Sequence, residues 1–377
     1  MNRRLLIFGG GATALIIITV IVVFIVLSNQ YHPKNTVDAF NEAIEGKDVD
    51  SLKELIVTDE KDAEINEASL SAFINYLQAN NESNQVIKKS LKKQLDNEDF
   101  TTSNEQVSLI EDGKTMGIFS NYKLKVKTVN LTIKGLDEDD QISLTIDGFE
   151  DKLSEVDNEE DLYGPLLPGE YDIEATIKNK LGTFDEEKKV DVWGNTDVSF
   201  LMDSESLVRK NKNIQKDIIQ AANAFNEDMS VYVTSGFEVD SFVNATEDLK
   251  DELSAFDYNF DSIKDYVEKI ESEFLEATIN MDEFDITQFD GEWAAEVTMF
   301  VSYDEMIKLK EEDTEDLSYT ELRILSLIFD KESDRWMVDD YNIEPFHQDD
   351  IDNWENKVEI DIDDSTNYEW SDEESFI

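Results

Sequence analysis

The sequence predicts a multidomain α+β protein: an N-terminal transmembrane helix, a helical domain, a small antiparallel β-sandwich and a C-terminal α+β cone. Three observations support this prediction. The run from Leu5 to Leu27 contains no charged residue, and about 20 apolar residues span a bilayer. Beyond it, apolar residues recur first at helical spacing and then with period two. The same succession of helical and strand patterns then repeats before an acidic end.

The first 28 residues predict a single-pass membrane anchor. Arg3 and Arg4 precede the apolar run and no acidic residue occurs before Asp38, so the positive-inside rule places residues 1–4 in the cytoplasm. A cleaved signal peptide is the alternative, but its apolar region is about 7–15 residues long and ends in a small-x-small site. The run at 5–28 is longer and ends without such a site. We therefore expect the lipid bilayer to be a partner and residues 29–377 to be extracytoplasmic.

Residues 35–118 read mainly as a helical membrane-proximal domain. A helix is expected after a Thr36 cap, and a second after an Asp48 cap. Two more helices are expected further on. The apolar positions at helical spacing are Val37, Phe40, Ile44, Leu52, Leu70, Phe73, Ile74, Leu77, Ile87, Leu91 and Leu95.

Residues 119–204 change to period two and predict a small antiparallel β-sandwich. Apolar residues alternate in several short segments, for example at Tyr171, Ile173, Ala175 and Ile177. Turn signals separate these segments, and Pro168-Gly169 suits the middle of a type II turn.

Residues 207–347 predict the α+β cone. A long helix carries Ile214, Ile218 and Phe225, and shorter helices are expected over 244–276 with Ile263 in the core. Strands follow from Ala277 onward, including a hairpin around 331–334. After these strands, residues 348–377 form an acidic tail, which is expected to be disordered and solvated, with interspersed aromatics that leave a binding role open.

Composition excludes several classes of function. The chain has 88 Asp and Glu against 33 Lys and Arg, a formal net charge of -55, so binding to nucleic acid is not expected. It has no cysteine and two histidines, which removes disulfides, Cys-ligated metals and a Cys nucleophile. We expect no cofactor and no structural metal, and the sequence specifies no oligomeric state.

Three segments resemble the TcaA family of teicoplanin-resistance-associated membrane proteins of Gram-positive bacteria. They run from Phe119 to Lys127, from Tyr163 to Tyr171, and from Leu181 through Gly194. The most specific positions are Gly164, Pro165, Leu166, Leu167, Pro168, Gly169, Tyr171 and Trp193. The resemblance implies a single-pass protein with a C-terminal domain of the NTF2-like type and a role in the glycopeptide response. Family members commonly carry a cytoplasmic four-cysteine zinc ribbon and can have two β domains, whereas here we expect no ribbon and one β domain.

Three motifs could carry chemistry, and each has a simpler interpretation. Ser90-x-x-Lys93 matches one motif of penicillin-binding enzymes, but Lys114-Thr115-Met116 stands where their K-T-G would be. His347 is the one histidine near the cone and is expected to be exposed. An EF-hand-like spacing lacks its glycine and predicts at most a weak association with Ca²⁺; its oxygen-bearing residues are Asp361, Asp363, Ser365, Asn367, Glu369 and Asp372.

The sequence therefore predicts a non-enzymatic, membrane-anchored envelope protein without catalytic, cofactor or metal residues. Its partner would be a cell-wall component or a membrane protein, through which it would modulate the antibiotic response. The alternative is an NTF2-like enzyme that acts on envelope polymers.

Overall fold

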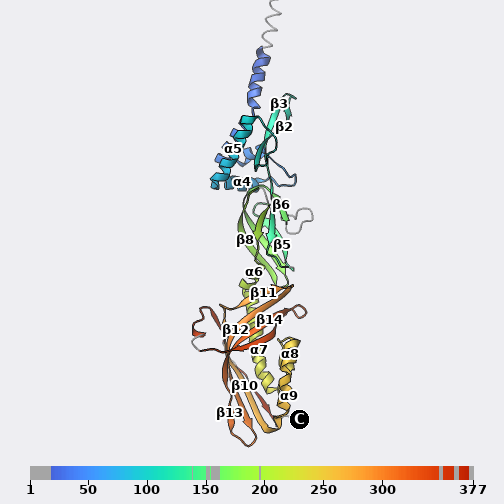
Figure 1. The fold of residues 1–377 in the computed structure, drawn as a ribbon, viewed down its shortest axis with the longest axis vertical. Helices are drawn as coiled ribbons and strands as arrows, with labels where there is room; N and C mark the ends of the chain where they lie inside the picture. The colour runs from blue at the N-terminus through green and yellow to red at the C-terminus, as the bar shows by residue number, and fades with distance from the viewer. Residues whose placement is uncertain are drawn as a thin grey trace, which may run out of the picture. The chain divides into compact units, whose positions relative to one another are not determined.

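The computed structural model describes residues 18–377 except 138, 150–152, 154–161, 195–196, 348–350, 361–364 and 373–377. The chain forms two compact units (Figure 1). One comprises residues 1–136, 141–177 and 185–202, and the other comprises residues 137–140, 178–184 and 203–377.

The first unit begins with helices. Residues 18–30 are helical, and α2 (Pro33–Gly46), α3 (Val49–Leu55), α4 (Glu67–Ala79) and α5 (Asn81–Asn97) follow. α2 starts before the predicted Thr36 cap: His32 accepts a hydrogen bond from the Lys34 amide at 3.2 Å, and Pro33 has the fixed φ that suits a first helical position. Asp48 caps α3 as predicted and accepts from the Ser51 amide at 3.0 Å.

The same helices pack against a three-stranded sheet that the helical prediction for 35–118 missed. β1 (Ile56–Thr58), β2 (Val107–Thr115) and β3 (Phe119–Val126) lie in the order β1-β3-β2, with β1 parallel to β3. Only Val107 and Leu109 alternate in β2 before its charged half, which is too short a pattern to predict a strand. The predicted boundary between 118 and 119 falls within the β2–β3 hairpin.

The β-sandwich consists of two three-stranded sheets. β6-β4-β9 form one and β5-β7-β8 the other. The buried alternation predicted along β7 is confirmed. One pair differs from the antiparallel prediction, because β4 and β9 run parallel. The strands are β4 (Val129–Lys134), β5 (Gln141–Ile146), β6 (Leu162–Leu166), β7 (Gly169–Asn179), β8 (Gly182–Val192) and β9 (Val198–Leu201).

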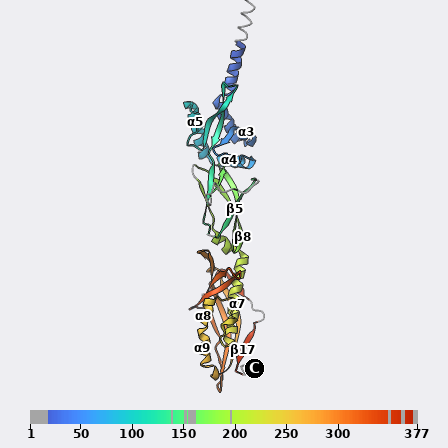
Figure 2. The ribbon, with the colours of Figure 1, turned by 90° about the vertical axis from the view of Figure 1, so that its right-hand side faces the viewer.

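The second unit places helices against a long curved sheet, as predicted. The sheet order is β15-β14-β12-β10, and α7 packs on β10, β12 and β15 (Figure 2). The predicted short helices end early because β10 already starts at Val267, and Ile263 is 51% exposed rather than in the core. The elements are α6 (Ser204–Lys210), α7 (Lys212–Thr234), α8 (Glu247–Leu253), α9 (Ala255–Asp261), β10 (Val267–Asn280), β11 (Asp285–Phe289), β12 (Glu292–Leu309), β13 (Thr314–Asp316), β14 (Tyr319–Asp330) and β15 (Arg335–Glu344).

The acidic tail was predicted to be disordered, and for two segments this is wrong. β16 (Lys357–Ile360) and β17 (Asn367–Ser371) both pair antiparallel with β10. Trp370 packs edge-on against Phe260 with ring centroids 5.1 Å apart. Glu369 forms an ion pair with Lys269 at 2.9 Å. The packing of Trp370 on Phe260 and the ion pair between Glu369 and Lys269 therefore offset the electrostatic repulsion among the carboxylates of the tail.

The predicted membrane segment falls only partly within the described residues. Residues 5–17 lie outside them, together with Arg3 and Arg4. Residues 18–27 are helical, and the large apolar side chains from 18 to 26 are 49% to 61% exposed. Among the residues that can be described, no helix combines the length and apolar character needed to cross a membrane.

Candidate functional site

A groove of about 720 Å³ lies between α2 and α5 in the first unit, and we call it the α2–α5 groove. Its long helices present apolar and basic side chains side by side, because residues four apart share one face of a helix. The residues that line it include Lys34 and Val37 of α2, Lys88, Lys92 and Leu95 of α5, and Phe100 with Tyr122.

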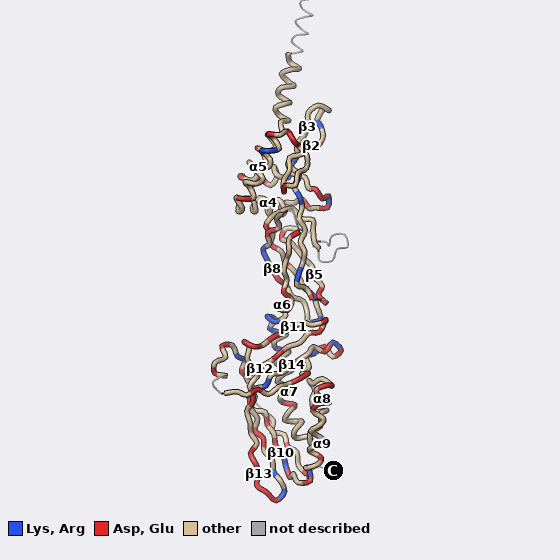
Figure 3. The backbone as a smooth tube through the Cα atoms, in the orientation of Figure 1, with Lys and Arg blue, Asp and Glu red and all other residues tan. Residues whose placement is uncertain are grey.

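The groove is close to neutral within a strongly acidic chain, because three lysines and three carboxylates line it. Lys88 and Lys92 of α5 line the groove, whereas Lys89 and Lys93 line another pocket. Figure 3 shows how basic and acidic residues are distributed along the backbone. Lys88 pairs with Glu45 at 3.3 Å, and both ends are accessible enough for the pair to be weak. Lys92 is exposed at the groove.

Carboxylates also line the groove and limit what it can hold. Lys34 forms an ion pair with Asp38, while Asp96 and Glu98 are exposed. A polyanion would meet repulsion from these groups. A ligand with a single anionic group next to an apolar chain matches this mixture of lysines, carboxylates and apolar side chains better than a polyanion does.

The apolar wall of the groove is formed by two aromatic rings. Phe100 and Tyr122 meet edge to face with centroids 5.0 Å apart. Burial raises the pKa of Tyr122 above its usual value; a hydrogen bond with Ser120 opposes this shift and the charge of Glu111 adds to it. Tyr122 therefore remains neutral and can offer both an apolar face and a hydroxyl to a ligand.

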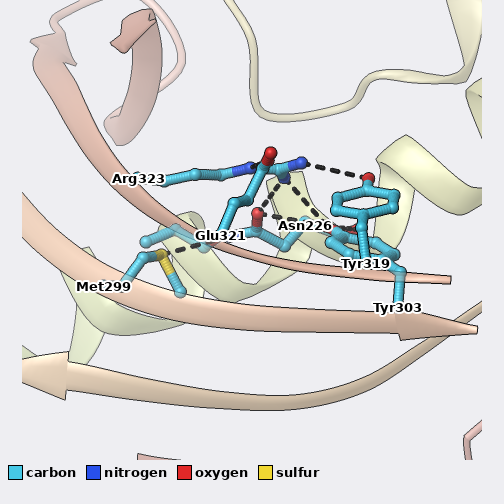
Figure 4. A network of polar contacts seen from close by, with 7 residues as sticks. Asn226, Met299, Tyr303, Tyr319, Glu321 and Arg323 are labelled. Carbon is cyan, nitrogen blue, oxygen red and sulfur yellow. Dashed lines mark hydrogen bonds and ion pairs between the residues drawn. The ribbon is translucent and has the colours of Figure 1, made fainter. Parts of the chain in front are cut away.

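A second candidate is a buried polar network in the C-terminal domain, shown in Figure 4. Alternation along β14 places Tyr319, Glu321 and Arg323 on the same face as the buried Leu325 and Leu327. Arg323 is 1% exposed, and the register of β12 with β14 sets Tyr303 opposite Tyr319. The strand pairing thus brings a guanidinium and two phenols together beneath α7.

Every part of the guanidinium has a protein partner. Nη1 donates to Asn226 Oδ1 at 2.5 Å and to the Tyr303 hydroxyl at 2.9 Å. Nη2 donates to the Tyr319 hydroxyl at 3.3 Å, and Nε forms an ion pair with Glu321. Tyr303 in turn donates to the Asn226 carbonyl at 2.9 Å.

The environment of the network keeps Arg323 charged and both tyrosines neutral. Burial acts to lower the pKa of Arg323, but Tyr303, Tyr319 and Glu321 raise it by more, so the guanidinium stays protonated. Burial raises the pKa of both tyrosines, which keeps them neutral. A neutral phenol and a protonated guanidinium are poor general bases.

Glu305 is one acid–base candidate in this domain. Burial raises its pKa, while a hydrogen bond from Ser272 at 3.1 Å and the charge of Arg323 lower it. Sequence reasoning missed both Glu305 and the Arg323 network. The signal was present in β14, where Glu321 and Arg323 keep the same phase as Leu325 and Leu327.

The predicted family positions gather where the β-sandwich meets α4 in the first unit. Leu167 is buried in the core of the helices, and Trp193 stacks on Tyr76 with centroids 4.3 Å apart. Gly169 does not occupy a type II turn: it starts β7 without a positive φ. A Cβ there would lie 2.8 Å from the backbone of Ala72, so close approach is what requires this glycine.

The other family positions lie immediately before and after Leu167 in the sequence. Tyr171 donates its hydroxyl to the Leu167 carbonyl at 2.6 Å. Gly164, Pro165 and Leu166 belong to β6, and Pro168 forms a bend before β7. These residues therefore join two parts of one unit.

Of the remaining motif residues, Ser90 and Lys93 both line one pocket of about 420 Å³ beside α5. His347 is exposed and follows β15.

The described part of the EF-hand-like spacing, from Ser365 to Asp372, is mainly a strand. Asp361 and Asp363 lie outside the described residues, Asn367 and Glu369 are on the extended β17, and Asp372 pairs with Lys310 at 2.6 Å. Within the described ranges, no group of three or more His, Asp or Glu residues could hold a metal ion.

Two family models match this chain, one in its N-terminal half and one in its C-terminal half. Residues 33–126 match the model of the TcaA protein second domain, and residues 218–342 match that of the YvbJ NTF2-like domain. The resemblance to the TcaA family is confirmed. The α2–α5 groove lies within the TcaA second domain apart from His32, and the Arg323 network lies within the NTF2-like domain.

A curated relative and a solved structure add detail. The uncharacterized membrane protein YvbJ of Bacillus subtilis strain 168 is 26% identical over 167 residues, which cover 44% of this chain and 26% of YvbJ. The crystal structure of the intermembrane space region of the chloroplast protein ARC6 aligns over 34% of this chain and 93% of that one, with 9% identity and a TM-score of 0.27.

Proposed function

We propose that the protein is a single-pass, membrane-anchored extracytoplasmic protein whose α2–α5 groove binds a cell-envelope amphiphile with one anionic group. The observation that carries this proposal is the groove itself, where Lys88 and Lys92 adjoin Leu95, Phe100 and Tyr122 in a chain of net charge -55. General acidity disfavours broad adhesion to an anionic surface, so we expect a local contact with the groove lysines and apolar side chains instead. The membrane-protein relative and the apolar helix at 18–27 support the anchor.

Photocrosslinking in cells tests the groove. A photoreactive phenylalanine replaces Tyr122 in the groove, and the matched control carries it at Phe289, which is 80% exposed in the NTF2-like domain. Position 122 should capture a lipid or lipid-linked wall molecule that position 289 does not. Equal capture at both positions would contradict the proposal.

The charge requirement is tested by a double substitution. Lys88→Glu with Lys92→Glu should reduce capture at least tenfold, because two repulsive charges then face the anionic group. Lys53→Glu with Lys61→Glu changes the net charge equally at exposed positions away from the groove. If both pairs reduce capture alike, the groove is not the site. The same strains report on glycopeptide susceptibility, which we expect only the groove variant to alter.

We propose no enzymatic activity for the NTF2-like domain. The partners that each Arg323 nitrogen has within the fold and the exposed position of His347 support this. A Glu305→Gln variant should keep the cellular phenotype, whereas its loss together with retained folding would favour the enzyme alternative.

Topology is tested separately. Protease added to intact protoplasts should remove the chain beyond about residue 30, and protection of these residues would refute the outward orientation.

A further inference from the structure

The tip of the β2–β3 hairpin is an exposed apolar feature of the first unit. The tip consists of residues 116–118, in which Met116 is 75% and Ile118 is 66% exposed. Met116 and Gly117 both have positive φ, at 54° and 73°, and the Ile118 amide donates to the Thr115 carbonyl at 3.2 Å. The turn thus satisfies this backbone group internally while it presents two large side chains outward.

The hairpin contacts the N-terminal helix immediately beside this tip. The ring of Phe119 lies 5.4 Å from that of Phe24 and 5.5 Å from that of Tyr31. Phe24 and Tyr31 are seven residues apart and so lie on one face of the helix, about 10 Å apart along its axis. Leu27, between them, is the one apolar residue over 18–27 that is half-buried rather than exposed.

The direction of the hairpin follows from its other end. Leu124 and Val126, at the far end of β3, are buried in the core of the helices. The tip therefore extends away from that core and along the N-terminal helix, as Figure 1 shows. Its apolar side chains and those of residues 18–26 form neighbouring exposed surfaces.

The chemistry of this surface fits the boundary of a bilayer. Tyr31 is an amphipathic ring of the kind enriched at membrane–water interfaces. Lys114, exposed on the hairpin, can lay its aliphatic chain along the tip while its ammonium stays in water. Backbone groups of an irregular turn cannot be left unpaired in hydrocarbon, which limits the tip to the headgroup–acyl boundary.

We propose that Met116 and Ile118 insert into the outer boundary of the bilayer, as a second membrane contact beside the anchor helix. This inference rests on the proposed membrane anchor and deepens it. The anchor helix and the hairpin tip are connected through Phe119, so together they hold the TcaA second domain in a defined orientation toward the lipid. A helix alone would leave the domain free to rotate.

Spin labelling of the full-length chain tests this inference, and the absence of cysteine means that each introduced cysteine is the only one. Met116→Cys and Ile118→Cys report on the tip, and Val22→Cys reports on the helix. Val86→Cys is the control, because Val86 is an aliphatic residue of the same domain that is 55% exposed. Each labelled chain is reconstituted in protein-free vesicles of phosphatidylcholine and phosphatidylglycerol, and collision rates with oxygen and with a water-soluble nickel complex are compared.

We expect labels at 22, 116 and 118 to collide preferentially with oxygen, and the label at 86 to collide preferentially with nickel. Oxygen preference at 22 together with nickel preference at 116 and 118 overturns the hairpin inference and leaves the anchor intact. That pattern would also arise if the tip bound a membrane protein instead of lipid. Nickel preference at 22 refutes the anchor, and the hairpin inference with it.

Discussion

Arg323 shows how one charged residue is accommodated in an apolar core. An isolated buried guanidinium would be costly, but here a carboxylate, an amide and two phenols give each of its three nitrogens a partner. Its ring contact with Tyr303, at 5.0 Å from the guanidinium carbon to the centroid, adds a cation–π term. The cost of burial is thereby offset only while every partner is present.

Replacement of Arg323 should consequently be severe. Arg323→Met leaves Glu321, whose side chain is 14% exposed, without its cation and should cost about 3–5 kcal/mol of unfolding free energy. Urea unfolding followed by tryptophan fluorescence measures this, since four of the five tryptophans lie in this unit.

Two variants serve as controls for Arg323→Met. The exposed Arg335→Met should change the unfolding free energy by less than about 0.5 kcal/mol. Adding Glu321→Gln to Arg323→Met should recover part of the loss, because the stranded charge disappears. No recovery would show that volume rather than charge is responsible.

Glu305 predicts a pH dependence. Because burial raises its pKa, the folded state holds its proton to higher pH than the unfolded state does. Stability therefore falls as pH rises through the interval between the ordinary and the raised value. Glu305→Gln removes this dependence and can keep the hydrogen bond from Ser272.

The free-energy difference between Glu305→Gln and wild type should thus grow in favour of the variant as pH rises through that interval. Urea unfolding across the acid range measures it, with Glu315→Gln on the exposed β13 as the matched control. A difference that does not vary with pH would contradict the role of burial.

Among the elements, α4 and the start of β7 depend on close contact. The chain at Gly169 lies against the backbone of Ala72 and Phe73, and the stacking of Trp193 on Tyr76 closes the same contact. Because the obstructing atoms are backbone, an added methyl group cannot be absorbed by a side-chain rotation.

Gly169→Ala should therefore destabilise the first unit by about 1–3 kcal/mol through overpacking. Gly46→Ala is the matched control, since nothing lies within 4 Å of its added Cβ, and it should be neutral or slightly stabilising. Thermal unfolding, monitored through Trp193, distinguishes the two. Equal effects would mean that loss of backbone freedom, not packing, governs Gly169.

At the scale of the whole molecule, charge is unevenly distributed along the chain. Residues 203–377 carry 50 Asp and Glu against 13 Lys and Arg, whereas residues 33–126 carry 18 against 11. Residues 33–126 are thus the less acidic of the two segments. Self-repulsion should act mainly on the NTF2-like domain.

The NTF2-like domain should therefore become more stable with added salt. Its unfolding midpoint should rise between about 0.01 M and 0.15 M NaCl, as the Debye length falls from about 30 Å to about 8 Å. Replacing the exposed Glu311, Glu312 and Asp313 by lysine should flatten this dependence. An unfolding midpoint indifferent to salt would argue that ion pairing already balances the repulsion.

Regular patterns made much of the fold predictable. Helical spacing marked α2, α4, α5 and α7, and alternation marked β7 and β14, because one buried face imposes a fixed period on each element. β2, β16 and β17 were not predicted, because their apolar alternation is short and their charged residues indicated a solvated segment. What holds β17 is Trp370 against Phe260, a contact between residues more than 100 positions apart.

The sequence by itself determined the acidity, the lack of thiol chemistry and the TcaA resemblance, all of which are local or additive properties of the residues. Tertiary structure alone decided that Lys88 and Tyr122 share a groove, that Arg323 meets Asn226, and that Phe119 meets Phe24. These juxtapositions join distant positions through strand register and helix packing. Periodicity reports which face of an element is buried, but not which other element covers it.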